Sequence, residues 1–291
     1  KALADASRAA PDVFTEVDEA LGQNLFRLMR DGPDEELKLT ENAQPAIMAH
    51  SIAVLRTMGV RLADVASFVA GHSLGEYSAL CAAGSFDLAT TAKLLKLRGQ
   101  VMQQAVPVGE GAMAALLGAD LALAQKIAET ASEGEVCTVA NDNDPSQVVI
   151  SGQKSAIDRA IAIAKDMGAK RAVPLPVSAP FHCPLMQPAA EAMRDALSYV
   201  VVEAPVVAVF ANVTAQPETD PDTIRTQLVE QVTGMVRWRE SVANIFDAGV
   251  HEFVEIGGKV LGAMVKRTVP DATVTSVVTI EDVEAAAKEI A

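Results

Sequence analysis

The fold is decided by residues 65–84, which read VASFVAGHSLGEYSALCAAG. The apolar run to Ala70 predicts a strand, and the pattern after Gly75 predicts a helix that ends near Gly84. The turn between them fits G-x-S-x-G, a motif that requires this context. Small glycines two positions before and two positions after Ser73 permit a sharp turn that exposes its Oγ at the N-terminus of the helix. We therefore expect Ser73 to attack a carbonyl and the Leu74 backbone N–H to receive the developing oxyanion.

The flanking sequence alternates short β-branched runs with longer helical patterns, which is typical of the α/β class. One helix is predicted to follow Thr40 and Asn42, which are both good capping residues, and to end at Gly59. The other helices predicted outside the middle of the chain span 13–30, 88–105, 184–199, 222–232, 238–248 and 260–267. The strands predicted there span 206–213, 252–256 and 273–278.

The middle of the chain has its own order of elements. Strands are predicted at 112–117, 135–139, 147–151 and 172–177, with helices at 121–133 and 155–168. This βαββαβ order is the split arrangement of ferredoxin-like domains. Pro- or Gly-rich joints lie at both ends of the segment. We therefore expect a small domain at 108–178, inserted into a large domain made of 1–107 and 179–291.

Composition excludes several classes of protein. The 291 residues are 50% hydrophobic, which excludes wholesale disorder, and a net charge of −14 argues against a nucleic-acid partner. No apolar run approaches the roughly 18 residues that span a bilayer, and the first twenty residues do not resemble a signal peptide. We expect a cytoplasmic protein without a membrane partner. Three widely spaced cysteines argue against a disulfide framework and a structural metal site.

A serine nucleophile needs a base, and the chain has four histidines. His72 is adjacent to Ser73, and neighbouring side chains on such a turn point apart. His50 lies on the apolar side of a predicted helix and His251 at the start of a predicted strand, so structural roles are expected for both. His182 lies in a loop between two prolines, where catalytic groups are often held. The sequence favours His182 as the base.

Arg98 is a cation on an apolar face of a predicted helix. It is surrounded by Leu94, Leu95, Val101 and Met102. A guanidinium cannot lose its proton, so burial requires a partner for it. The partner is either an internal acid or the carboxylate of a ligand, and the third alternative is that the side chain extends to the surface.

Four segments resemble malonyl-CoA:acyl-carrier-protein transacylases in order along nearly the whole chain. They are Gly71-His72-Ser73-Leu74-Gly75-Glu76-Tyr77-Ser78-Ala79-Leu80, Lys96-Leu97-Arg98-Gly99-Gln100-Val101-Met102-Gln103, Gln147-Val148-Val149-Ile150-Ser151-Gly152 and Val177-Ser178-Ala179-Pro180-Phe181-His182-Cys183. The resemblance implies an α/β-hydrolase-like large domain that carries an inserted ferredoxin-like small domain, with the active site between them.

The resemblance also implies a ping-pong reaction. Ser73 takes the malonyl group from malonyl-CoA, and the phosphopantetheine thiol of acyl carrier protein then accepts it, with His182 as base and acid in each half-reaction. The matching position implies that the backbone carbonyl of Gln231 orients His182. Arg98 would bind the free carboxylate of malonate, and Phe181 would exclude a methyl branch. The protein would need no cofactor of its own, since CoA belongs to the substrate and phosphopantetheine to the partner.

The family normally begins with a strand and a Gly-Gln-Gly-Ser-Gln loop, whose glutamine supplies a second oxyanion donor. This sequence has no such motif, and we expect that the natural beginning lies outside it. We expect a monomer. Carrier proteins are usually acidic, so docking requires a locally basic surface, for which Lys165, Lys170 and Arg171 are candidates.

Two other functions compete with acyl transfer. A serine esterase or thioesterase of the same broad fold would place its histidine late in the chain, as His251 with Asp247 or Asp220. A carrier-protein docking module with an inactive site is the non-enzymatic alternative.

Overall fold

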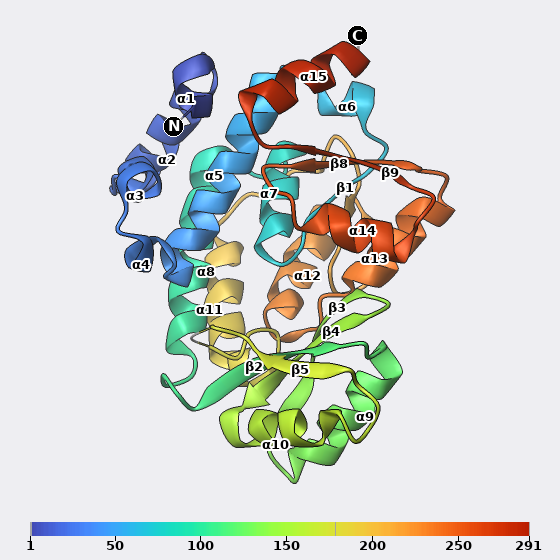
Figure 1. The fold of residues 1–291 in the computed structure, drawn as a ribbon. Coiled ribbons are helices and arrows are strands. Elements are labelled where there is room, and N and C mark those ends of the chain that lie inside the picture. Colours follow the sequence, from blue (N-terminus) through green and yellow to red (C-terminus); the bar gives the residue numbers. More distant parts are fainter. Residues whose placement is uncertain (1, 178, 291) are drawn as a thin grey trace.

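The computed structural model describes residues 2–177 and 179–290, as a larger part above a smaller one (Figure 1). The larger part begins with α1 (Ala2–Ala6), α2 (Ala10–Leu21), α3 (Leu25–Asp31), α4 (Asp34–Leu37), α5 (Thr40–Met58), α6 (Leu62–Val65), β1 (Val69–Ala70), α7 (Leu74–Ala82) and α8 (Leu88–Gln104). It resumes with η1 (Pro184–Met186), α11 (Gln187–Ser198), β6 (Val209–Phe210), β7 (Pro217–Glu218), α12 (Pro221–Thr233), α13 (Trp238–Asp247), β8 (Glu252–Ile256), α14 (Leu261–Thr268), β9 (Thr273–Val277) and α15 (Ile280–Ile290).

Parallel strand pairs organise the larger part. β1 pairs with β6 in parallel, and β7 pairs with β6 on its other side in the antiparallel sense. β8 and β9 form a separate parallel pair. Parallel strands need long crossover connections, and in this chain helices supply them. The mixed α/β class predicted from the sequence is confirmed.

The central strands are shorter than predicted. The run that begins at Val65 forms a strand only at Val69–Ala70, because Leu62–Val65 is helical. The run that begins at Val206 forms a strand only at Val209–Phe210. The Val206 N–H donates instead to the Ala83 carbonyl at 2.8 Å, so this residue contacts the segment after α7 and does not pair in the sheet. Both predictions were wrong in extent because apolar residues also line connecting segments.

Two helix boundaries also differ from prediction. The helix predicted over 13–30 is divided at Gly22, which adopts a left-handed φ of 57° and ends α2. Asn24 then caps α3 by accepting the Arg27 N–H. Thr40 and Asn42 lie inside α5 and do not cap it, since Leu39 holds the N-cap position.

Within residues 2–177 and 179–290, no helix combines the length and the apolar character that crossing a membrane requires.

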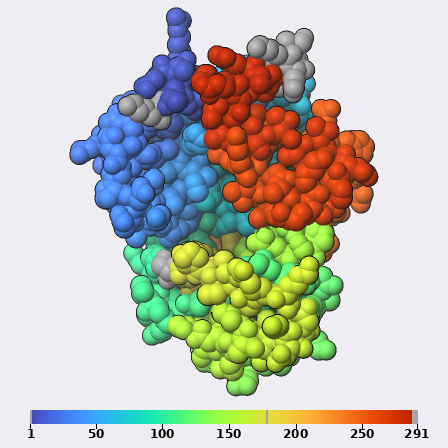
Figure 2. Space-filling model, in the orientation of Figure 1, coloured from blue at the N-terminus to red at the C-terminus, as the bar shows by residue number. Residues whose placement is uncertain are grey.

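Residues 111–174 form the smaller part, which we call the small unit. It contains β2 (Gly111–Leu117), α9 (Leu121–Ser132), β3 (Cys137–Asp144), β4 (Gln147–Gln153), α10 (Lys154–Ala164) and β5 (Arg171–Pro174). Its strands are antiparallel in the order β3-β4-β2-β5, and apolar residues of α9 and α10 pack on the sheet. Figure 2 shows the small unit gathered at one end of the molecule.

Strand β3 joins the small unit to the larger part. It extends to Asp144, five residues beyond the predicted end, and the Asp142 N–H donates to the Val236 carbonyl at 3.0 Å. The Asp142 and Asp144 side chains are buried, and each pairs with an arginine, Arg239 on α13 or Arg267 on α14. These pairs explain why a strand can continue through a polar run that a sequence pattern assigns to a loop.

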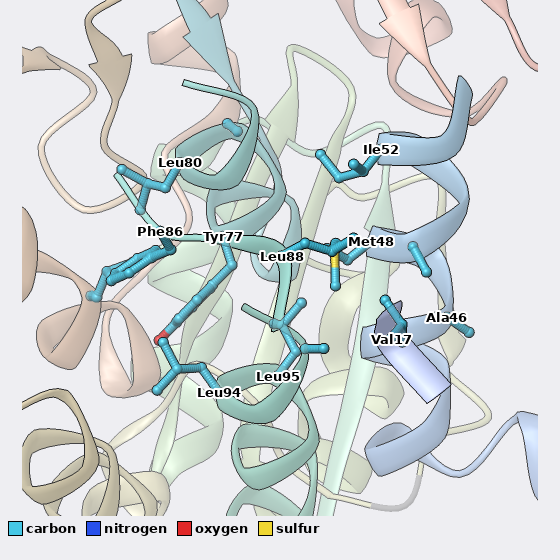
Figure 3. Close-up of a cluster of buried hydrophobic side chains, with 14 of the residues drawn as sticks. Val17, Ala46, Met48, Ile52, Tyr77, Leu80, Phe86, Leu88, Leu94 and Leu95 are labelled. Carbon is cyan, nitrogen blue, oxygen red and sulfur yellow. The ribbon is translucent and has the colours of Figure 1, made fainter. Parts of the chain in front are cut away.

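The main core lies where α5, α7 and α8 pack together. Figure 3 shows Met48 and Ile52 of α5 beside Leu88 and Leu95 of α8, with Tyr77 of α7 extending toward Leu94. At the α5–α8 contact, a Cβ on Gly99 would lie 2.4 Å from the Glu41 backbone, so only glycine permits this approach. The contact fixes α8, which carries Arg98, against the helix that carries Gln44.

Candidate active site

The turn between β1 and α7 holds Ser73 in a strained conformation. Its φ of 52° lies in a region that residues other than glycine rarely adopt, and it occupies the N-cap position of α7. Gly71 is required by space, because a Cβ there would lie 1.9 Å from the Gly75 carbonyl oxygen. Gly75 has open space around its Cβ position, so crowding does not explain that second glycine.

Ser73 and His182 meet although 109 positions separate them. The Ser73 Oγ lies 2.7 Å from His182 Nε2, and His182 Nδ1 lies 2.8 Å from the backbone carbonyl oxygen of Gln231. A carbonyl can only accept, so Nδ1 carries the proton and donates to Gln231. Nε2 then has a free lone pair, which accepts a hydrogen bond from the Ser73 hydroxyl.

The environment of His182 keeps its imidazole neutral. Burial, and secondly the positive charge of Arg98, lower the pKa of His182 from 6.5 to about 3. A neutral imidazole is the form that can take a proton from a serine. His72 is turned away, because its Nε2 lies 2.8 Å from the Asn143 Oδ1 of the small unit. Of these two histidines, only His182 has a ring nitrogen in contact with the Ser73 Oγ in the described part of the chain.

Arg98 is 1% exposed, so its side chain does not extend to the surface. Its Nη1 donates to the Gln44 Oε1 at 2.8 Å, and its Nη2 donates to the Gln231 Oε1 at 2.9 Å. Nη2 also donates to the Ser73 Oγ at 3.0 Å. These partners are neutral, and no carboxylate among residues 2–177 and 179–290 forms an ion pair with Arg98. Glu76 is the nearby acid that acts electrostatically on Arg98, but no hydrogen bond or ion pair joins the two side chains. A buried guanidinium whose hydrogen-bond partners are all neutral is suited to a ligand carboxylate.

The remaining sequence candidates occupy different places. Phe181 packs against both the main core and the β2–β3–β4 face of the small unit, so it lies at the junction of the two parts. His251 is exposed, and its ring packs edge-on against Phe246 with 4.5 Å between the ring centroids. Asp220 caps α12 by accepting the Thr223 N–H. In the described part of the chain, no cluster of three or more His, Cys, Asp or Glu side chains is arranged to hold a metal ion.

This chain is similar to known proteins over nearly its whole length. Residues 1–287 match the family described as acyl transferase domain. The chain belongs to this family. It is 45% identical over 278 residues to the malonyl CoA-acyl carrier protein transacylase of Escherichia coli K12, and the match covers 94% of this chain and 90% of the relative.

Solved structures of similar proteins superpose closely on this chain. The acyl-carrier-protein-S-malonyltransferase of Bartonella henselae has a TM-score of 0.96 and 51% identity, covering 99% of this chain and 93% of that one. A malonyl-transacylase in complex with a type II PKS acyl-carrier protein has a TM-score of 0.96 and 39% identity, covering 99% and 94%. The close agreement extends over the small unit as well as the larger part.

Sequence reasoning missed three polar residues of the candidate site: Gln44, Glu76 and Asn212. All three are buried. Glu76 follows Gly75 within the quoted motif, and a carboxylate on the inner side of a helix beside the nucleophile was a signal that could have been used. Gln44 and Asn212 gave no such signal, because their partners come from distant parts of the chain.

Burial raises the pKa of the Glu76 carboxyl from 4.5 to about 7, against the opposing effects of hydrogen bonds from Gln231 and Asn212 and of the Arg98 charge. The raised pKa means that ionisation of Glu76 costs more in the folded state than in the unfolded state. The contribution of Glu76 to stability is therefore greatest below pH 4.5 and is lost as pH rises through about 7.

Replacing Glu76 with glutamine should remove this dependence. Relative to the unmodified chain, the free energy of unfolding of Glu76→Gln should rise between pH 4.5 and about pH 7 and then level off. Urea unfolding of both proteins across this range measures the difference. A difference that stays constant with pH would show that Glu76 does not titrate in this way.

Proposed function

We propose that this chain transfers a malonyl group from malonyl-CoA to the phosphopantetheine thiol of acyl carrier protein through a malonyl-Ser73 intermediate. One observation carries the proposal. The Ser73 Oγ lies within hydrogen-bond distance of both the His182 Nε2 and the Arg98 Nη2. The nucleophile thus stands between a neutral base and a buried cation, as attack on an acyl group with a free carboxylate requires.

In the first half-reaction Ser73 becomes acylated. The Ser73 hydroxyl gives its proton to the His182 Nε2 as Oγ forms a bond to the thioester carbonyl carbon. The Leu74 N–H donates to no described residue, so it is available to the oxyanion that develops. When the carbon–sulfur bond breaks, the imidazolium returns its proton to the departing CoA thiolate. The Gln231 carbonyl stabilises the transient imidazolium through Nδ1–H.

The second half-reaction reverses these roles. The phosphopantetheine thiol loses its proton to His182, its sulfur attacks the malonyl ester, and the Ser73 oxygen leaves with the proton from His182. Arg98 holds the free malonyl carboxylate in both halves, through the two parallel hydrogen bonds that a planar guanidinium can donate. Phe181, at the junction of the two parts, limits the space beside the acyl chain and so excludes a methyl branch.

The finer fold assignment is part of this proposal. We assign residues 1–107 and 179–291 to an α/β-hydrolase-like catalytic domain and residues 108–178 to an inserted ferredoxin-like domain. The strand order β3-β4-β2-β5 and the parallel β1–β6 pair beside the nucleophile turn support the assignment. Ser178, at the proposed boundary, lies outside the described residues.

The fate of the acyl group distinguishes transfer from hydrolysis. The chain is mixed with malonyl-CoA, with and without acyl carrier protein that bears phosphopantetheine, and free CoA, malonate and malonyl carrier protein are measured over time. A transferase releases about one CoA per chain and then waits for the carrier protein. Steady malonate formation at the same rate without carrier protein would instead establish a thioesterase.

The carrier protein should dock through exposed cations of the small unit. Lys165, Lys170 and Arg171 are exposed, and none forms an ion pair within the described residues. Reversing their charges should slow transfer to the carrier protein about tenfold at low salt and leave acylation by malonyl-CoA unchanged. Lys93→Glu on α8 is the control, because Lys93 is an exposed cation of the larger part. Unchanged transfer by the triple variant would exclude this surface.

A further inference from the structure

Three buried polar side chains connect the separate parts of the catalytic site. Glu76 lies in α7, Asn212 follows β6, and Gln231 lies in α12, and we call these three residues the buried frame. The Glu76 Oε2 accepts hydrogen bonds from the Asn212 N–H at 3.0 Å and from the Gln231 Nε2 at 2.7 Å. The three side chains are at most 3% exposed. The Glu76 Oε2 therefore links α7 to the segment after β6 and to α12, three parts of the chain that lie far apart in the sequence.

Asn212 binds both sides of the strained turn. Its Oδ1 accepts the Ser73 N–H at 2.7 Å, and its Nδ2 donates to the Gly71 carbonyl oxygen at 2.7 Å. A residue with φ near 52° persists only where its surroundings hold it there. These two hydrogen bonds come from the segment that follows β6, the strand next to β1, and hold the turn in the conformation that directs the Ser73 Oγ toward His182.

The Gln231 side chain acts at a different point from its backbone. Its Nε2 donates to Glu76 and to the Ser73 carbonyl oxygen at 3.0 Å, so its Oε1 must face the opposite way. In that direction Oε1 accepts from the Arg98 Nη2 at 2.9 Å. The carboxylate of Glu76 thus fixes which end of the amide meets the guanidinium, while the backbone carbonyl of the same residue holds His182.

We propose that Glu76 and Asn212 are positioning residues that set the reactive arrangement of Ser73, His182 and Arg98 through the hydrogen bonds of the buried frame. Neither residue touches the Oγ or the His182 ring in the hydrogen bonds described, so each acts through another residue. The proposal rests on the proposed role of Ser73 as the nucleophile. It predicts that the hydrogen-bond acceptor at position 76 matters more than the negative charge there.

The test compares Glu76→Met, Glu76→Gln and Asn212→Ala with the unmodified chain. Two rates are measured: acylation of Ser73 by malonyl-CoA, and modification of Ser73 by a fluorophosphonate, a serine reagent without a malonyl carboxylate. Glu76→Met is similar in size and has no oxygen acceptor, so both rates should fall about 10- to 100-fold. Glu76→Gln retains an acceptor, and its rates should stay within about threefold of the original. Asn212→Ala should slow both rates as Glu76→Met does.

Asn42→Ala is the matched control. Asn42 is buried and its side chain makes three hydrogen bonds, to Gln23, Lys96 and the Glu36 carbonyl, and no hydrogen bond or ion pair described joins these partners to Ser73, His182 or Arg98. Its variant should react at the original rates even where its thermal stability falls. If Asn212→Ala does not fold, the two Glu76 variants decide the question, because both retain the size of the original side chain.

The outcomes separate this inference from the proposed function. Equal fluorophosphonate rates for Glu76→Met and the original chain would overturn the positioning role. Equal losses in Glu76→Met and Glu76→Gln would also overturn it, because an acceptor alone would then not suffice. If the original chain reacts with the fluorophosphonate but not with malonyl-CoA, the proposed function is wrong. The fluorophosphonate rates of the variants still test the positioning role of the buried frame.

Discussion

Replacing His182 with alanine should slow acylation of Ser73 by malonyl-CoA about 100- to 10,000-fold, the usual contribution of a general base. The 2.7 Å contact between the Ser73 Oγ and the His182 Nε2 is the physical reason, since no other imidazole contacts Oγ in the described part of the chain. Rapid mixing with malonyl-CoA and detection of the CoA released in the first turnover measures the rate directly.

The control for this prediction is His251→Ala. His251 is exposed and packs on Phe246, so its removal should leave acylation unchanged. Thermal unfolding of His182→Ala shows whether the buried loop has survived the substitution, and His182→Asn retains a polar side chain in case it has not. Loss of acylation in His251→Ala with retention in His182→Ala would contradict the proposed mechanism and favour the hydrolase alternative.

Replacing Arg98 with alanine should slow malonyl transfer about 100-fold or more, while acetyl transfer from acetyl-CoA should change little or rise. Only malonate presents a carboxylate, and Arg98 is a buried cation whose hydrogen-bond partners are all neutral. The ratio of kcat/KM for the two acyl groups is the measurement. Acetyl-CoA serves as the internal control, because general damage to the site slows both reactions.

Arg98→Lys sharpens the interpretation. Lysine keeps the charge but lacks the planar fork that reaches both Gln44 and Gln231, so we expect a malonyl rate between those of the arginine and alanine forms. Equal losses with malonyl-CoA and acetyl-CoA in both variants would show that Arg98 supports the structure of the site and does not select the acyl group.

The sequence predicted the fold where local patterns decide it. The small unit follows the predicted order of strands and helices, because each element carries its own apolar period and turn residues. The exceptions depend on tertiary contacts. β3 continues to Asp144 because Arg239 and Arg267 pair with buried aspartates, and the strand expected at Val206 is shortened by a contact with Ala83. No local pattern contains these partners.

The same division applies to the candidate site. Ser73 was predicted as the nucleophile from its motif, and His182 was favoured as the base from its place in a proline-flanked loop. Gln231 was assigned only for its backbone carbonyl, through the resemblance to transacylases. Its side-chain hydrogen bonds to Arg98 and Glu76, and those of Asn212 to the Ser73 turn, were missed. The hydrogen-bond partners in a buried polar network depend on which distant segments of the chain pack together. The local patterns of a single sequence do not show which segments these are.

The intact mass of the chain after exposure to malonyl-CoA tests the central claim most directly. The account predicts that the original chain gains the mass of one malonyl group and that fragmentation places the group on Ser73. Ser73→Ala should gain nothing under the same conditions, and acyl carrier protein should remove the group from the original chain. A malonyl group found on any other residue, or an unmodified mass for the folded original chain, would contradict the account.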